Sequence, residues 1–460
     1  MRKLGLKRER TAKIYLNPIG RVDLTTGGDA GGFGYAEDSY NFDCSRGELD
    51  TAVGAVDFFD GEEVDAVKYY FYKRRDPVTG NADDRIMFYS TDGKVYEFSD
   101  GSPVEVNGLS YQDAPVGVCY NLNGADVIVF SSKSGDMKIY NGSYVTPVSD
   151  APPVTSMAIH YERLFITGGD DDTLWFSDDF DPTNWNLSVS EAGFIDLADG
   201  RGEVLKCVSF EDYLFVFRRY GITRVTAFAD QTEFSAAGLY VSSGKIYPDS
   251  VTLCGDCILF FASDGVYRFN GVSAVKISAP FFAALDATDE NVSGRYYDGY
   301  AYFNVTAKGE EKKRILRIDP HRGDFCFLKG LDPKDILLVA GTDEYALLVH
   351  DGEKNAPVRI INDGTGVLGD ETECFWKSKE TDFGLPIKNK RLAEIKFSAN
   401  APVTVKVVAD GKESEYADGG SGGIRRIRPD ARGDRFSVSF KSVGSGIRIS
   451  DVELTFRYYL

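Results

Sequence analysis

Two cysteines are the closest approach to a chemical motif in this sequence. Cys254 and Cys257 form a C-x-x-C pair that leads into an apolar run. A redox pair works best at the N-terminus of a helix, where the helix dipole lowers the thiol pKa, but this run is typical of a strand. A zinc site needs a second pair or histidines at ligand spacing, and none follows. We therefore expect both residues to be ordinary buried cysteines.

The histidines and serines give no catalytic frame either. The three histidines, His160, His321 and His350, stand beside strand–turn boundaries and outside any H-E-x-x-H motif. The letters of a G-x-S-x-G motif occur in residues 419–423. A nucleophile elbow needs a strand before that motif and a helix after it, and neither pattern is present. A flexible glycine-rich loop fits these residues better.

Two acidic clusters, at residues 168–172 and 178–181, carry the oxygen ligands that Ca²⁺ favours. Their spacing matches no EF-hand loop, and sequences rich in Gly and Asp are typical of solvated hairpin turns. The sequence contains no phosphate-binding loop and no dinucleotide fingerprint. We therefore predict that the protein is not an enzyme, with no catalytic, cofactor-binding or metal-binding residues and no cofactor.

The composition favours an ordered, strand-rich chain. The 460 residues are 43% hydrophobic and 13% aromatic, and the 48 glycines suit a protein with many turns. The net charge of −19 repels nucleic-acid phosphates, which argues against tight binding of DNA. It would suit a conduit that must not grip DNA, although solubility is the simpler explanation. Seven scattered cysteines, no secretion signal and no membrane-spanning run predict folding in a cytoplasm.

The elements that must position any site are short antiparallel strands. Residues 255–277 read GDCILFFASDGVYRFNGVSAVKI. The apolar run Cys257–Ala262 is typical of a strand covered on both faces. Ser263-Asp264-Gly265 and Asn270-Gly271 have the residues that tight turns require. The segment therefore predicts a three-stranded meander.

This unit recurs along the chain. Six other segments show an apolar strand, a polar or Gly-containing turn and an alternating strand, and the copies are spaced by 37 to 50 residues. Their apolar strands are marked by Ile86, Val127, Leu164, Leu214, Ile258, Ala301 and Ala346. A four-stranded propeller blade takes roughly 40–50 residues. We predict an all-β protein with a β-propeller of about seven blades, six to eight being compatible with the spacing; unrelated hairpins in stacked sandwiches are the alternative.

Three parts follow from where the period starts and stops. Residues 1–57 are rich in Gly and weakly periodic, which predicts an extended N-terminal arm that packs on the propeller or on a neighbouring subunit. Residues 58–370 hold the propeller. Residues 371–460 have alternating runs of another spacing and predict a C-terminal β-sandwich.

One stretch resembles a known family. Glu162–Asn186 reads ERLFITGGDDDTLWFSDDFDPTNWN, in which an apolar strand and an LWFS strand lead to D-P-T-N-W. This form is similar to propeller-containing tail nozzle or hub proteins of short-tailed bacteriophages, the packaged-DNA stabilisation type. The residues that carry the likeness are Leu174, Trp175, Ser177, Asp181, Pro182, Asn184 and Trp185. Blade packing is the simpler role for both tryptophans.

The resemblance implies a structural role in the virion tail. A homo-oligomeric ring, six-fold by preference, would lie below the portal and adaptor proteins, and DNA would pass through its lumen without sequence-specific binding. Such a subunit is assembled in the host cytoplasm and has no membrane-spanning segment. An acidic lumen would let DNA slide.

Two other functions stay open. A carbohydrate-binding or carbohydrate-active propeller would show exposed aromatic residues on its loops. A cytoplasmic scaffold propeller would bind peptides, but the sequence lacks WD and kelch signatures.

Overall fold

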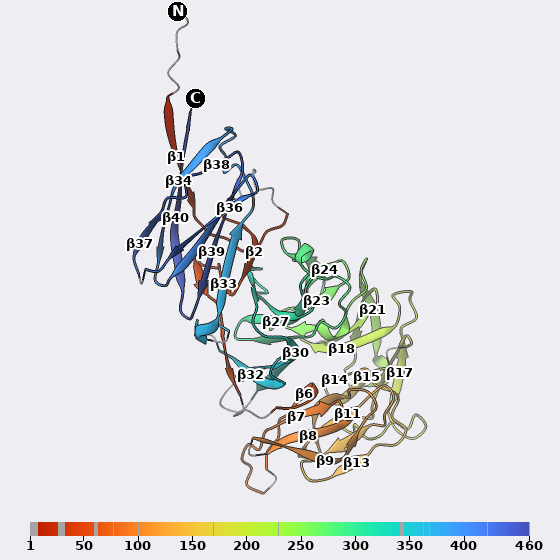
Figure 1. Ribbon diagram of the computed structural model, residues 1–460. Coiled ribbons are helices and arrows are strands. Elements are labelled where there is room, and N and C mark those ends of the chain that lie inside the picture. Colours follow the sequence, from red (N-terminus) through yellow and green to blue (C-terminus); the bar gives the residue numbers. More distant parts are fainter. Residues whose placement is uncertain are drawn as a thin grey trace, which may run out of the picture.

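A computed structural model gives the structure of the chain, and nearly every regular element in it is a β-strand (Figure 1). The residues that it describes are 8–25, 33–58, 63–76, 78–99, 101–168, 170–228, 230–340, 345–361, 363–367, 369–420 and 422–459. Within them the helical elements are the 3-10 turns η2 (Gln231–Glu233), η3 (Pro248–Ser250), η4 (Phe282–Ala284) and η5 (Gly369–Glu371). None of these turns has the length or apolar character needed to cross a membrane.

Seven four-stranded antiparallel sheets are formed by the described residues between 54 and 361. The first four are β6 (Ala66–Tyr72), β7 (Arg85–Ser90), β8 (Lys94–Ser99) and β9 (Ser102–Ser110); β10 (Val116–Leu122), β11 (Ala125–Ser131), β12 (Lys138–Tyr140) and β13 (Val145–Pro147); β14 (Ser156–His160), β15 (Arg163–Thr167), β16 (Thr173–Phe176) and β17 (Gly193–Asp196); and β18 (Val204–Phe210), β19 (Tyr213–Arg218), β20 (Gly221–Thr226) and β21 (Ser235–Val241). The other three are β22 (Thr252–Leu253), β23 (Ile258–Ala262), β24 (Gly265–Phe269) and β25 (Ala274–Lys276); β26 (Gly294–Tyr297), β27 (Tyr300–Thr306), β28 (Lys313–Ile318) and β29 (Phe325–Leu328); and β30 (Pro333–Ala340), β31 (Tyr345–Asp351), β32 (Ala356–Ile361) and β5 (Gly54–Asp57).

The repeat found in the sequence corresponds to these sheets. Each of the seven marker residues, from Ile86 in β7 to Ala346 in β31, lies in the second strand of a different sheet. The meander expected in residues 255–277 is confirmed, since β23, β24 and β25 pair in that order. All five residues of β23 are buried, as an apolar run covered on both faces requires.

The sheets follow one another in a propeller-like ring. The first strand of each sheet lies beside the first strand of the next sheet; between the fourth and fifth sheets the contact is with the turn η3, just before β22. β30 of the last sheet lies beside β6 of the first. A hydrophobic cluster fills each boundary between neighbouring sheets; Phe217 and Phe260, for example, meet edge to face with centroids 5.5 Å apart. A small sheet cannot bury both faces alone, so the ring arrangement supplies the missing cover.

The ring is closed by a strand from the beginning of the chain. β5 pairs with β32, with Gly54 opposite Ile361 and Asp57 opposite Val358. Backbone hydrogen bonds therefore hold the two ends of the repeating region together. β5 supplies the fourth strand of the last sheet.

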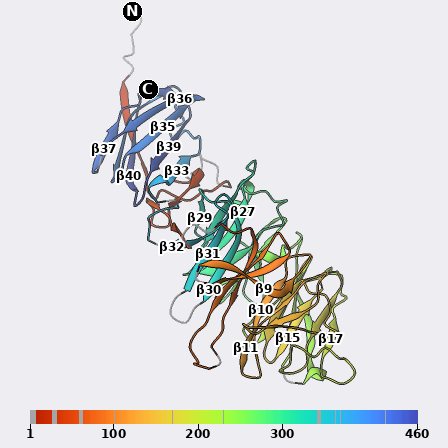
Figure 2. The same cartoon turned by 60° about the horizontal axis from the view of Figure 1, so that its bottom comes forward.

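The remaining strands form a five-stranded and a seven-stranded sheet at the other end of the molecule (Figure 2). The five-stranded sheet contains β2 (Ala36–Tyr40), β33 (Glu373–Ser378), β39 (Phe436–Val443), β35 (Val403–Ala409) and β36 (Lys412–Asp418). The seven-stranded sheet contains β3 (Phe42–Asp43), β4 (Leu49–Thr51), β40 (Arg448–Tyr459), β34 (Lys390–Ala399), β37 (Ile424–Ile427), β1 (Glu9–Leu16) and β38 (Ala431–Gly433). The two sheets share one hydrophobic cluster, in which Trp376 and Phe440 pack 6.1 Å apart.

The segment expected to be an arm is largely woven into these sheets. β1 pairs along its whole length with β40, and β2 pairs with β33. Between β2 and β3, the buried Asn41 side chain donates to the Lys329 carbonyl at 2.8 Å and to the Glu373 carbonyl at 2.9 Å. The described part of residues 8–57 thus connects the ring to the C-terminal sheets within one chain.

Candidate functional site

The surface most suited to contact another molecule is a group of exposed aromatic side chains on the third and fourth sheets. We call Tyr161, Phe180 and Phe228 the aromatic patch; they are 44%, 70% and 62% exposed. The rings of Tyr161 and Phe228 meet edge to face at 5.0 Å. The Phe180 N–H donates to the carbonyl of Glu162, the neighbour of Tyr161, at 3.0 Å. Large apolar groups gathered in this way on a surface are typical of interaction sites.

The backbone holds two of these rings in a conformation that is unusual for aromatic residues. Tyr161 has φ 51° and Phe180 has φ 53°. Tyr161 stands in the two-residue turn between β14 and β15, where the corresponding turn between β10 and β11 has the favourable pair Asn123-Gly124. A left-handed conformation costs an L-residue about 1–2 kcal/mol. The chain retains aromatic rings at positions where Asn or Gly would be more stable.

The charges around the aromatic patch are acidic. Asp179 and Asp212 are exposed beside it, as is Asp230 before η2. The cation Arg163, which follows Tyr161 and Glu162 in the chain, is buried and already paired with Glu191, its Nη2 lying 2.5 Å from the carboxylate. A partner carrying both apolar and basic side chains would therefore match this surface.

The two tryptophans of the D-P-T-N-W region have packing roles, as expected from the sequence. Trp185 is buried in the cluster between the second and third sheets, and its indole N–H donates to the Pro182 carbonyl at 3.0 Å. Trp175 packs on the Phe194 ring at 5.1 Å. The aromatic patch was not expected from the sequence, although an aromatic residue in a two-residue hairpin turn is a signal that could have revealed it.

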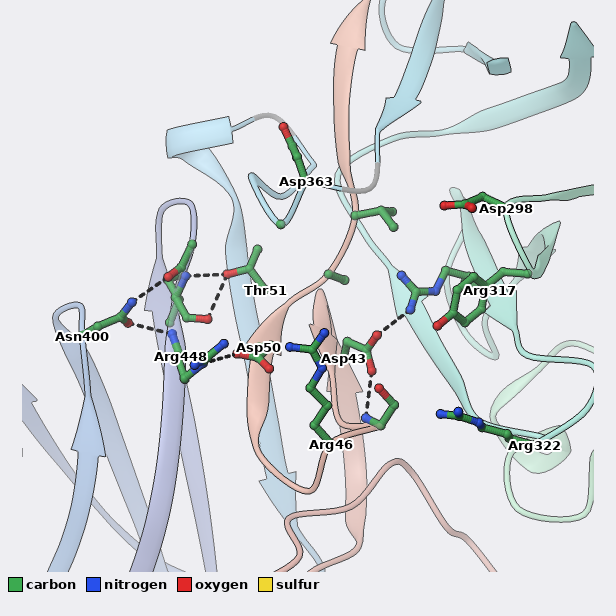
Figure 3. Close-up of a pocket in the computed structure, with 17 residues that line it drawn as sticks. Asp43, Arg46, Asp50, Thr51, Asp298, Arg317, Arg322, Asp363, Asn400 and Arg448 are labelled. Atoms are coloured by element: carbon green, nitrogen blue, oxygen red, sulfur yellow. Dashed lines mark hydrogen bonds and ion pairs between the residues drawn. The ribbon is translucent and has the colours of Figure 1, made fainter. Parts of the chain in front are cut away.

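A polar cavity of about 780 Å³ lies where the ring meets the C-terminal sheets (Figure 3). It is lined by the turn between β3 and β4, by β27 and β28 of the sixth sheet, and by the start of β40. Four arginines and four aspartates face it: Arg46, Arg317, Arg322, Arg448, Asp43, Asp50, Asp298 and Asp363.

The best-placed charges of this cavity are paired with each other. The buried Arg317 guanidinium contacts Asp43 at 2.5 Å and stacks over the Tyr300 ring at 4.0 Å. Burial alone would raise the pKa of Asp43, but Arg317 and the Ser45 N–H hold it below its ordinary value. Arg448 bonds Asp50 at 2.7 Å. The Arg317–Asp43 pair joins the ring to the C-terminal sheets, whereas Arg448 and Asp50 link two strands of the seven-stranded sheet, so we interpret the cavity as a structural joint.

The cysteine pair lies where the sequence analysis expected it. Cys254 and Cys257 are buried just before β23, and the Cys254 N–H donates to the Cys257 carbonyl at 2.7 Å. The adjacent Cys257 thiol and burial both raise the pKa of Cys254. All seven cysteines are free thiols. An inert structural pair fits this setting.

The three histidines are not brought together. His160 is buried at the end of β14 and bonds Ser209 Oγ through Nδ1 at 2.9 Å. His350 is buried in β31 and bonds the Tyr69 hydroxyl at 2.9 Å. Burial is the main cause that lowers the pKa of each to about 4. His321 is half exposed in the turn after β28.

The acidic clusters behave as turns in the part that the structure describes. Asp171 Oδ1 accepts from the Thr173 N–H at 3.1 Å, and Asp178 Oδ2 accepts from Asn184 at 2.7 Å. No group of three or more potential metal ligands comes together among the described residues. Gly169 of the first cluster and Ser421 of the G-x-S-x-G letters lie outside those residues.

Comparisons with known proteins give likeness in structure alone. No family model matches the sequence, and no curated protein matches it. The chain is similar to BBS1N, solved in complex with ARL6DN, with 11% identity and a TM-score of 0.46 over 68% of this chain and 98% of that one. It is also similar to BamB from Moraxella catarrhalis, with 12% identity and a TM-score of 0.40 over 67% of this chain and 99% of that one.

Proposed function

We propose that this chain is a non-enzymatic structural subunit that assembles into a ring in the tail of a short-tailed bacteriophage, as a nozzle or hub. The seven four-stranded sheets are the blades of one β-propeller, and the five- and seven-stranded sheets are the two layers of a C-terminal β-sandwich. The observation that carries the proposal is the aromatic patch, because Tyr161 directly precedes Glu162–Asn186, the stretch that resembles such proteins, and Phe180 lies within it.

The neighbour in this ring is a second copy of the chain. Residues 1–10 read MRKLGLKRER, with five basic residues, one acidic residue and two leucines. This combination complements an aromatic surface flanked by carboxylates, through apolar contact and cation–π attraction. We assign this basic segment of one copy to the aromatic patch of the next.

The positions of the two surfaces favour a ring over a closed pair. β1 begins at the opposite end of the molecule from β14 and β15, which carry Tyr161 in their turn (Figure 1). The described end of the basic segment, Arg8–Arg10, therefore lies far from the patch of the same copy. Contact between two different surfaces is head-to-tail, and head-to-tail contacts generate rings when the rotation closes.

The oligomeric ring then acts through its place in the tail and through its negative charge. Its lumen would pass DNA on ejection and retain it beforehand, below the portal and adaptor proteins. The net charge of −19 per copy keeps the contact with DNA phosphates weak, so that DNA slides without sequence-specific binding.

A mixing experiment tests the contact directly. One variant carries Tyr161→Ser and Phe228→Ser, and a second carries Arg2→Glu, Lys3→Glu and Lys7→Glu. Each variant alone is expected to be monomeric, while an equal mixture forms a dimer, since one intact contact remains between the two. Val78→Ser, which changes an exposed apolar residue in the loop between β6 and β7, is the control and should assemble as the wild type does. Assembly by either variant alone would refute the head-to-tail contact.

A carbohydrate-binding or carbohydrate-active propeller is the second candidate, because exposed aromatic rings on loops are also the surface on which sugars stack. Glycan-array binding that is lost in the Tyr161→Ser, Phe228→Ser variant would favour it. The structural proposal predicts no such binding.

A further inference from the structure

Cationic side chains gather where the first strands of the sheets face the axis of the ring. Lys68 lies in β6 of the first sheet, Lys206 in β18 of the fourth and Arg295 in β26 of the sixth. Lys206 is close enough to the other two for their charges to act on it, although the three come from different sides of the ring. Figure 1 shows β6, β14, β18 and β30 grouped around the centre. The three cations therefore approach one place on the axis from three separate strands.

Register shifts in the strands stand beside two of these cations, Lys68 and Lys206. The pairing of β6 with β7 shifts register between Ala66 and Lys68, and that of β18 with β19 shifts between Val204 and Lys206. A similar shift stands just before Asp335 in β30. A β-bulge bends a strand and re-aims the side chain beside it, and bulges are frequent next to active sites. A register shift thus precedes three charged residues at the axis, Lys68, Lys206 and Asp335. This repetition indicates that the strands position these residues to bind a ligand.

The two lysines have no partner among the described residues. No ion pair or hydrogen bond joins the ammonium group of Lys68 or Lys206 to another described side chain or carbonyl, and both side chains are partly buried. The Arg295 guanidinium donates to its neighbouring Gly294 carbonyl at 2.7 Å. Cations gathered without a direct ion pair lose hydration and repel each other, a cost that a bound anion would reduce.

Two carboxylates complete the cluster without neutralising it. Asp335 is buried, and one of its oxygens accepts the Tyr69 N–H at 2.7 Å. Asp249, in η3, is open to solvent, although surrounding protein atoms partly desolvate its carboxylate. The nearby cations Lys206, Lys68 and Arg295 outweigh this desolvation and lower the pKa of Asp249. Burial, with Arg295 and Lys68, lowers the pKa of Lys206 to about 8, against the attraction of Asp249. Three cations face two carboxylates, so the site keeps a positive excess in an acidic chain.

We propose that the axis of the ring binds one phosphate group, held by Lys68, Lys206 and Arg295, with Asp249 accepting a hydrogen bond from a phosphate hydroxyl. Several oxygens on one compact anion match donors that arrive from three directions. The Asp249 carboxylate repels a fully ionised oxyanion and favours one that still carries a proton. This selects free phosphate, which keeps a hydroxyl at pH 7, over sulfate and over the diesters of a nucleic-acid backbone.

Isothermal titration of the full chain with inorganic phosphate at pH 7 tests the site. Sulfate and dimethyl phosphate serve as the comparison anions, since neither offers a hydroxyl to Asp249 at this pH. Phosphate is expected to bind with one-to-one stoichiometry and at least tenfold more tightly than either. Equal affinity for dimethyl phosphate would assign the site to nucleic-acid backbone and overturn the proposed selectivity.

Two lysine variants distinguish binding at this site from a general electrostatic attraction of phosphate to lysines on the surface. Lys206→Met should weaken phosphate binding at least tenfold, while Lys412→Met, which removes an exposed lysine from β36, should leave it unchanged. Lys206→Met is expected to fold, because it removes an unpaired and partly buried charge. A thermal unfolding curve without phosphate verifies this, and the rise in Tm that phosphate produces should be absent in the variant.

Proton uptake gives an independent readout. Binding of the anion should raise the pKa of Lys206, so that at pH 8 the wild type takes up more protons than Lys206→Arg, as measured by titration in buffers of different ionisation enthalpy. Lys206→Arg keeps the charge and should retain affinity within about threefold. Unchanged affinity in Lys206→Met, or equal proton uptake in the two proteins, would overturn the proposal. The site does not depend on the assembly of copies into an oligomer, since monomeric variants should bind phosphate equally well.

Discussion

Charged side chains are used in opposite ways in two regions of the molecule. One region is the joint between the ring and the C-terminal sheets, and the other is the axis of the ring. In the joint, the buried Arg317 has Asp43 at 2.5 Å and Tyr300 beneath it. At the axis, Lys68 and Lys206 have no ion pair with any described residue. Paired charges fix the relative position of two parts of a chain, whereas unpaired ones carry a free-energy cost that a bound anion can reduce.

The contrast separates charges that stabilise the fold from charges that serve binding. Removing one member of a buried pair exposes the other to an apolar setting and destabilises the protein. Removing a charge that had no partner should do the reverse. The following changes test this difference in order of decreasing effect on stability.

Asp43→Asn should destabilise the protein most. It leaves the buried Arg317 without its counter-charge, and breaking such a pair costs about 3–5 kcal/mol. Because the pKa of Asp43 is lowered in the folded state, its contribution is present above the ordinary value of about 3.9 and is lost as the pH falls through the lowered one. Urea unfolding measures both. Asp50→Asn is the control, since its partner Arg448 is half exposed and the loss should be under about 1 kcal/mol.

Acidification should unfold the protein through its buried histidines. The unfolded chain takes up protons below about pH 6.5, whereas the pKa of folded His350 is about 4. Stability therefore falls as the pH falls from 6.5 to 4, by about 2–3 kcal/mol for this residue. His350→Gln should flatten the pH dependence of the unfolding free energy by that amount. A slope identical to that of the wild type would contradict the buried neutral state.

Lys206→Met should stabilise the protein, by about 1–2 kcal/mol at pH 7, because the cost of the unpaired charge disappears. In the wild type the cost is fully present below pH 8 and is relieved as Lys206 deprotonates above it, so stability should rise between pH 8 and 9.5. A variant less stable than the wild type in chemical denaturation would show that the axis is structural, like the joint.

Tyr161→Asn should have the smallest effect on stability. Asn tolerates a φ of 51° better than Tyr does, which offsets the lost contact with Phe228, so the monomer should change by less than about 0.5 kcal/mol. Assembly should nevertheless be weakened. A large loss of Tm would mean that the aromatic patch is part of the fold and not an interaction surface.

Local features of the fold could be predicted from the sequence, and distant pairings could not. Asn270-Gly271 and the apolar run before it predicted a meander because their signals lie within a few residues. The pairing of Gly54 with Ile361, by contrast, has no local signal, since a short strand can join any free sheet edge. The bulge before Lys206 and the exposure of Phe180 likewise depend on neighbours far away in the chain.

Native mass spectrometry of the full chain at micromolar concentration tests the proposed assembly most directly. We expect one closed oligomer of identical copies, six by preference, that dissociates when Phe228 is replaced by Ser. A strict monomer, both alone and after incubation with a phage portal protein, would contradict it.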